Sequence, residues 1–195
     1  MGNEKSDPKA ALGLNSLFGA IIQMLSLTEL GLSAALVYNM YKPVAENNQK
    51  KINALLNLYK KSYQVIGIII LFLGLILIPF LPYLIKGDNL LEVNITYIYI
   101  IQLINTVLSY FLFAYKQSLL VAYQREDINS IINLVTQFSL QAIQILLLIY
   151  TKNYYLYVLC MPVFTVINNI WIGFITKKMF PNAICSGLID KKDLK

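Results

Sequence analysis

Long, mostly apolar runs separated by short polar segments make up most of this chain. Five runs reach the roughly 20 residues that a helix needs to cross a bilayer, at about 12–41, 63–85, 95–123, 131–150 and 154–175. The first and third are longer than a span requires, which indicates tilted helices or helices that begin at the interface. The pattern predicts an all-α membrane protein in which residues 1–195 form a single transmembrane domain.

The polar segment 42–62, between the first two runs, carries its own helical pattern. Its apolar residues fall at i, i+3, i+4 and i+7, namely Ile52, Leu55, Leu56 and Tyr59. Lysine and asparagine cover most of the remaining surface, Pro43 marks the end of the first span, and Asn47 or Asn48 is placed to cap the new helix. We favour a short basic amphipathic helix lying along the inner leaflet over a solvated connector.

Composition supports a membrane location and narrows the chemistry. The chain is 57% hydrophobic and 13% charged, with a mean hydropathy of +0.60, whereas soluble domains carry about 25% charged residues. Histidine is absent and only Cys160 and Cys185 are present, so we expect no metal site and no cofactor. The net charge is +6, and the positive residues lie between the apolar runs. This placement indicates topology signals and contacts with lipid headgroups rather than nucleic-acid binding.

Lysine and arginine also predict the orientation. They concentrate in the segments 42–62, 124–130 and 176–195, which we expect to be cytoplasmic loops, while the other connections hold only Lys86 and Lys152. The amino terminus must then face outward and the carboxyl terminus the cytoplasm. Since the first residues lack the layout of a signal peptide, this start predicts that a preceding helix is missing.

Aromatic rings gather near the ends of the predicted spans, as in the aromatic belts of membrane proteins. They are Tyr38, Tyr41, Tyr63, Tyr83, Tyr97, Tyr123, Tyr150, Tyr154 and Trp171. We expect them at headgroup depth. The second span has no polar side chain between Gln64 and its outer end, so we expect that span to face lipid.

Polar side chains inside the other spans form stripes. On the first span Asn15, Gly19, Gln23, Ser26, Glu29 and Ser33 share one arc; the third carries Gln102, Asn105, Ser109 and Lys116; the fourth carries Asn133, Gln137, Gln141 and Gln144; the fifth adds Asn168 and Asn169. Such amides can join helices, at about 0.5–2 kcal/mol each, or they can line a wet cavity. Three continuous stripes favour the cavity.

Glu29 is the one carboxylate deep in a predicted span. A carboxylate at that depth costs roughly 2.5–3.5 kcal/mol on insertion scales, so it requires a role or a partner. It either binds a proton or cation, or pairs with a lysine or arginine of another helix, or is a neutral buried carboxyl bonded to Ser and Thr neighbours. The sequence leaves these alternatives open.

One stretch carries a family resemblance. Residues 26–63 read SLTELGLSAALVYNMYKPVAENNQKKINALLNLYKKSY, with GLNSLF before them and IPFLPYLIK after them. This stretch resembles the Wzx-type polysaccharide flippases of the multidrug/oligosaccharidyl-lipid/polysaccharide exporter superfamily. It corresponds to that family's second helix, basic inner loop and third helix.

The resemblance implies two helical bundles around a cavity that alternates between the faces of a bacterial plasma membrane. The implied substrate is an undecaprenyl-pyrophosphate-linked oligosaccharide, moved from the inner to the outer leaflet for capsule or O-antigen synthesis. Implied partners are membrane lipids, a polysaccharide polymerase and glycosyltransferases. The chain resembles most of an amino-terminal bundle, without the family's first helix and carboxyl-terminal bundle. A separately encoded second bundle and an inactive fragment both stay open.

Other functions are weighed against this one. A cation-coupled drug antiporter of the same superfamily and a non-transporting membrane scaffold are the alternatives. An enzyme is not expected, because there is no histidine, no nucleophile–base pair and no glycine-rich phosphate loop. Lys116 and Arg125 are basic candidates, although the loop rule explains Arg125 better. The candidate transport residues are Glu29, Gln23, Gln102, Asn105, Lys116, Gln137, Gln141 and Gln144.

Overall fold

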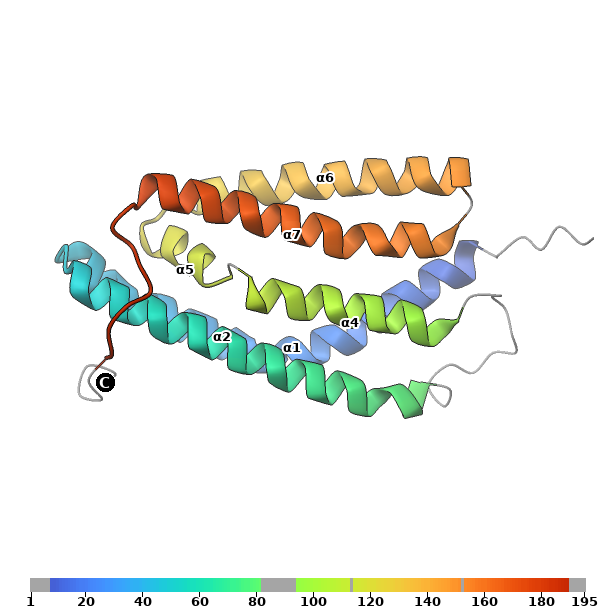
Figure 1. Ribbon diagram of the computed structural model, residues 1–195, viewed down its shortest axis with the longest axis horizontal. Helices are drawn as coiled ribbons and strands as arrows, with labels where there is room; N and C mark the ends of the chain where they lie inside the picture. The colour runs from blue at the N-terminus through green and yellow to red at the C-terminus, as the bar shows by residue number, and fades with distance from the viewer. Residues whose placement is uncertain (1–7, 82–93, 113, 152, 190–195) are drawn as a thin grey trace, which may run out of the picture.

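The computed structural model describes residues 8–81, 94–112, 114–151 and 153–189, and this part of the chain is helical without any strand. Its elements are α1 (Pro8–Ala45), α2 (Gln49–Leu77), the short 3-10 helix η1 (Ile78–Phe80), α4 (Ile95–Phe111), α5 (Ala114–Ala122), α6 (Glu126–Thr151) and α7 (Tyr154–Met179). Figure 1 shows an elongated bundle whose long helices run along a common axis. The all-helical fold agrees with the prediction.

Three helices in the described residues are long and apolar enough to cross a membrane, which indicates a membrane protein. They are α2 continued by η1, α6 and α7. The predicted third span, 95–123, is not one straight helix, because α4 and α5 meet at a bend of 51°; the pair adds a fourth span if it is counted as one. The predicted count of five is not confirmed. The first predicted span, 12–41, lies in α1, where many side chains lie outside the described residues.

The helix predicted within segment 42–62 is present, but the connection before it is a tight helical hairpin and not a long loop. α1 continues through Pro43 to Ala45, and α2 begins at Gln49. Asn47 has a φ of 52°, its N–H donates to the Val44 carbonyl, and the Asn48 N–H donates to the Pro43 carbonyl at 2.9 Å. This is the Schellman arrangement that ends many helices.

The α2 helix begins directly after this turn. The Asn48 side chain accepts a hydrogen bond from the Lys51 N–H, which confirms it as the N-cap. Its amphipathic part and its apolar part then form one continuous helix, so the expected interfacial helix is wrong. All members of the predicted stripe, Ile52, Leu55, Leu56 and Tyr59, are buried in the protein core rather than in the leaflet.

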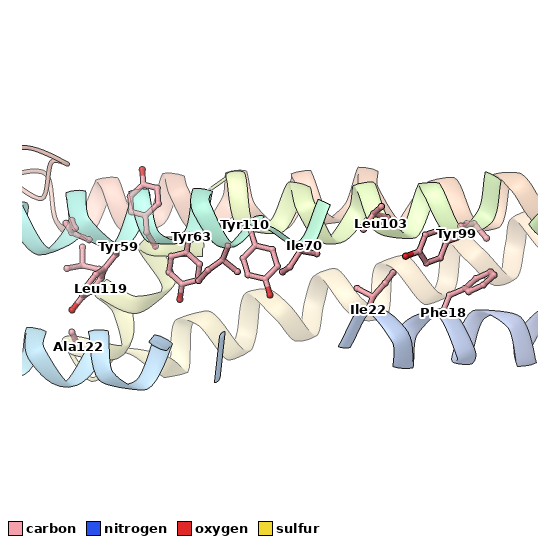
Figure 2. Packing of buried hydrophobic residues seen from close by; sticks show 14 of the residues in the cluster. Phe18, Ile22, Tyr59, Tyr63, Ile70, Tyr99, Leu103, Tyr110, Leu119 and Ala122 are labelled. Atoms are coloured by element: carbon pink, nitrogen blue, oxygen red, sulfur yellow. The ribbon is translucent and has the colours of Figure 1, made fainter. Parts of the chain in front are cut away.

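The core follows the seam between α2 and its neighbours (Figure 2). Gly67 and Gly74, two turns apart on α2, bring this helix close to α4: a Cβ on Gly67 would lie 3.1 Å from the Tyr110 Cβ, and one on Gly74 would lie 2.7 Å from Leu103 Cδ2. Tyr99 closes the seam by donating its hydroxyl to the Gly74 carbonyl at 3.0 Å. One face of the predicted second span therefore packs on protein, and only the opposite face is exposed.

The aromatic belt stays a prediction, but its rings have two different environments, apart from Tyr83, which lies outside the described residues. Tyr38, Tyr97 and Tyr150 are exposed near helix ends, as a belt requires. Tyr63 and Tyr154 are instead buried in the core, where their rings pack beside Tyr110 and Tyr157. Packing in the protein core thus accounts for these two rings without a belt.

The three segments rich in lysine or arginine lie at one end of the bundle (Figure 1). These are the α1–α2 turn with the start of α2, the α5–α6 turn, and the end of α7 with the residues after it. The α5–α6 turn repeats the first hairpin: Gln124 has a φ of 56° and the Arg125 N–H donates to the Leu120 carbonyl at 2.8 Å. We call this the lysine-rich end. Its assignment to the cytoplasm stays a prediction.

The predicted loop 176–195 is also replaced in its described part. α7 continues to Met179, and residues 180–189, which we call the C-terminal strap, cross from α7 to α2 (Figure 1). Three amide side chains of α2 hold the strap: Gln49 donates to the Asn182 carbonyl at 2.9 Å, Asn53 accepts from the Ile184 N–H at 3.1 Å, and Asn57 donates to the Gly187 carbonyl at 2.9 Å. The polar face of the amphipathic pattern therefore binds backbone.

Candidate polar groove

The polar stripes predicted on α4, α6 and α7 meet inside the bundle. Thr165 on α7 donates its hydroxyl to Asn105 Oδ1 on α4 at 2.6 Å. One turn further along α7, Asn168 Nδ2 donates to Asn133 Oδ1 on α6 at 2.9 Å. These two bonds form a polar bridge across three helices that are otherwise largely apolar.

A cavity of about 320 Å³ adjoins this bridge. It is lined by Ser109, Tyr110, Gln117, Asn133, Thr136, Gln137, Leu140, Phe164, Thr165, Asn168 and Asn169, from α4, α5, α6 and α7. Its lining consists mostly of amides, hydroxyls and ring faces, with no ionised side chain among the described residues. We call it the inner cavity.

Two buried oxygen atoms of the inner cavity have no hydrogen-bond partner within the described protein. They are Thr136 Oγ1, on a residue only 8% exposed, and Asn168 Oδ1. Leaving a buried polar atom unpaired costs about 1–3 kcal/mol, so such atoms are uncommon and point to a function. Here both atoms belong to residues that line one cavity, which makes it a candidate site for a polar guest.

A second cavity, of about 400 Å³, lies between α1, α4 and α7. Its lining is Gly19, Ile22, Gln23, Gln102, Asn105, Thr106 and Met161. Asn105 belongs to this lining and bonds to Thr165 of the inner cavity. The two linings together form what we call the polar groove, which follows the polar face of α4.

Four of the candidate transport residues lie in the polar groove: Gln23, Gln102, Asn105 and Gln137. Gln144 does not, because its buried amide donates to the Tyr157 carbonyl at 3.0 Å and so joins α6 to α7. Gln141 is exposed on α6 and lines neither cavity. Gln144 therefore joins helices, which was the alternative to lining a cavity. The cavity stripe predicted on α6 ends at Gln137.

The charged candidates lie elsewhere. Lys116, on α5, donates to the Gly173 carbonyl at 3.3 Å and lines a separate cavity at the lysine-rich end. Arg125 is exposed and forms a two-bonded ion pair with Asp127, at 3.0 and 3.2 Å. Glu29 lies within α1, but its side chain is outside the described residues, as are those of Asn15, Ser26 and Ser33.

Sequence reasoning missed the threonines. Thr106, Thr136 and Thr165 all line the groove, although threonine occurs both in apolar helices and in polar sites. The available signal was spacing, since Thr136 precedes Gln137 and lies three residues after Asn133, while Thr165 lies three residues before Asn168. A threonine on the arc of an amide stripe is therefore a better cavity candidate than an isolated one.

The chain matches no family model, no curated protein and no solved structure. The function is therefore inferred from the groove itself. Paired amides and hydroxyls can both donate and accept hydrogen bonds, and the rings of Tyr110 and Phe164 add apolar surface. Such a lining suits an uncharged, hydroxyl-rich guest better than a bare ion.

Proposed function

We propose that this chain is part of a bacterial membrane transporter that moves lipid-linked oligosaccharides from the inner to the outer leaflet. The observation that carries the proposal is the inner cavity, with the unpartnered oxygens of Thr136 and Asn168 inside an apolar bundle. Its volume of about 320 Å³ lies at the lower end of small-molecule sites, which range over about 300–1,000 Å³. One or two sugar units are a guest of suitable size and polarity.

The neutral lining favours a sugar over the cation of an antiporter. A cation binding site needs carboxylates or a dense shell of oxygens, and none of the described residues that line the two cavities of the groove is acidic. Sugar hydroxyls instead pair with amides and hydroxyls, and their C–H faces pack on rings. In this proposal the polar groove holds the oligosaccharide as it crosses the apolar layer.

The amphiphilic character of the substrate also fits the surface beside the groove. Large apolar side chains are exposed on the outer face of α6, among them Leu134, Phe138 and Ile145. A polyprenyl chain can remain in lipid against such a face while its sugars lie in the groove. The likeness of residues 26–63 to Wzx-type flippases supports the same function. In this proposal a second bundle forms the facing wall of the groove.

The test is deletion of the gene in its source bacterium, followed by return of defined variants. The deletion strain is expected to lose surface polysaccharide and to accumulate the lipid-linked precursor. The wild-type chain should restore the polymer, and the double variant Thr136→Val, Asn168→Leu should restore much less. Ser139→Ala is the control, because Ser139 is an exposed α6 residue whose hydroxyl bonds only to the Val135 carbonyl in its own helix.

The same strains separate the alternatives. Unchanged surface polymer together with new drug sensitivity would assign the chain to the antiporters instead. If deletion removes the polymer and the double variant restores it as well as the wild type does, the groove is not needed for transport. That result would favour the scaffold.

A further inference from the structure

A third cavity lies at the lysine-rich end and has a very different lining. Its volume is about 260 Å³, and three lysines from three helices line it: Lys60 on α2, Lys116 on α5 and Lys177 on α7. The other lining residues are Leu56, Tyr115, Leu119, Thr176, Pro181, Ala183, Ile184 and Cys185. No carboxylate of the described residues is among them. We call it the basic cavity, and it shares no residue with the polar groove.

The basic cavity is built rather than a chance gathering of surface charge. Lys116 is half-buried, and its bond to the Gly173 carbonyl fixes the ammonium group between α5 and α7. The C-terminal strap forms one wall through Pro181 and residues 183–185, and three hydrogen bonds from α2 hold that strap in place. Lysines thus converge from elements far apart in the sequence.

Like charges brought together in this way repel one another unless an anion accompanies them. The ion pairs within the described residues lie elsewhere, at Lys42–Glu46 and Arg125–Asp127. The three ammonium groups form a donor set suited to a phosphate group, whereas the Thr176 hydroxyl already donates to the Ile172 carbonyl.

We propose that the basic cavity binds a phosphate-bearing anion. The shared chemistry is a phosphate mono- or diester, from either the headgroup of an anionic phospholipid or a soluble phosphate compound. Its position favours the lipid: α2 and α7, which supply two of its lysines, are long and apolar enough to cross a membrane, and basic pockets between such helices bind anionic headgroups. A lipid bound there would clamp the strap, α2, α5 and α7 together.

The experiment compares two double variants of equal charge. Lys60→Gln, Lys177→Gln removes two cations of the cavity, whereas Lys61→Gln, Lys178→Gln removes their exposed sequence neighbours, which do not line it. The purified full chain is titrated with phosphatidylglycerol in mixed micelles, with phosphatidylcholine as the zwitterionic reference and inorganic pyrophosphate as the soluble arm. Binding is read by native mass spectrometry and by the shift in melting temperature.

We expect the Lys60, Lys177 variant to lose roughly tenfold or more of its affinity for phosphatidylglycerol, and the Lys61, Lys178 variant to change by less than about threefold. Equal losses in the two variants would overturn the proposal, since they would show a diffuse basic surface. Absence of binding by every probe to the wild type would overturn it too. Pyrophosphate binding that only the Lys60, Lys177 variant loses would uphold the phosphate site and assign it to a soluble ligand. Circular dichroism checks that both variants are folded.

Discussion

At the residue scale, Thr136 gives stronger evidence for a binding role than any residue predicted from the sequence. Its hydroxyl is buried, lines the inner cavity and has no partner in the described protein. A residue that only joined helices would have its hydroxyl paired, as Thr165 does with Asn105. The two threonines therefore separate a binding role from a joining role within one groove.

The variant Thr136→Val tests this distinction. Removing an unpaired buried hydroxyl while keeping the shape of the side chain should leave stability unchanged or raise it, by up to about 1–3 kcal/mol. Transport should fall by roughly two- to tenfold, because one hydrogen bond to the guest is lost. Melting temperature and surface polymer are measured on the same variant, with Ser139→Ala beside it. A destabilised protein with full transport would show that the hydroxyl is structural.

The helix-joining bond has the opposite signature. A double-mutant cycle on Asn105→Ala and Thr165→Ala should give a coupling energy of about 0.5–2 kcal/mol, as interhelical hydrogen bonds in membranes do. Unfolding in mixed micelles with increasing denaturing detergent measures it. A cycle with no coupling would contradict the bridge between α4 and α7.

Residues differed in how far the sequence could predict them. Gln23, Gln102, Asn105 and Gln137 were predicted for the groove because amides are rare in spans and their spacing gives a face. Gln144 fits the same spacing, yet it points to the Tyr157 carbonyl. Which neighbour an amide meets depends on how helices cross, and a one-dimensional pattern does not contain that.

At the element scale, α2 shows why a helix surface is hard to assign from hydropathy. Its apolar half looks uniform in sequence, but Gly67 and Gly74 mark one face for close packing against α4. Its amphipathic half was expected in the leaflet because a membrane surface and a protein core both accept an apolar stripe. The stripe packs against α1 and α5, and the strap that binds the polar side of this half lies more than a hundred residues away.

The α2–α4 seam makes a direct prediction. Gly74→Leu should destabilise the chain by about 1–3 kcal/mol or more, because the new side chain would overlap the buried Leu103. Gly13→Leu is the control, since no atom lies within 4 Å of the position its Cβ would take. Thermal unfolding followed by fluorescence-detected size exclusion compares the two. Equal melting temperatures would mean that α2 and α4 are not in close contact.

At the scale of the whole molecule, the lysine pattern predicts which end faces the cytoplasm. Cys160 and Cys185 are first replaced by serine. The single variants Glu46→Cys and Thr151→Cys then place one thiol at each end of the bundle. A membrane-impermeant thiol reagent should label the cysteine at 151 on intact cells, and the one at 46 only after permeabilisation. The reverse labelling pattern would contradict the predicted orientation and would place the basic cavity in the outer leaflet.

The whole molecule also shows what a sequence leaves undetermined. The helical class and three of the spans followed from run lengths alone. The bend of 51° between α4 and α5 and the strap across α2 did not, because both depend on packing between distant segments. The groove arises at this scale, from the convergence of polar stripes on separate helices.

The central claim, that the chain takes part in moving lipid-linked oligosaccharide across the membrane, is tested most directly by where that lipid resides. Spheroplasts of the deletion strain are compared with and without the restored gene, and a membrane-impermeant oxidant measures the fraction of lipid-linked sugar on the outer face. The account predicts that the wild-type chain restores this fraction and that the Thr136→Val, Asn168→Leu variant leaves it near the deletion level. An outer fraction that is the same with and without the gene would contradict the account.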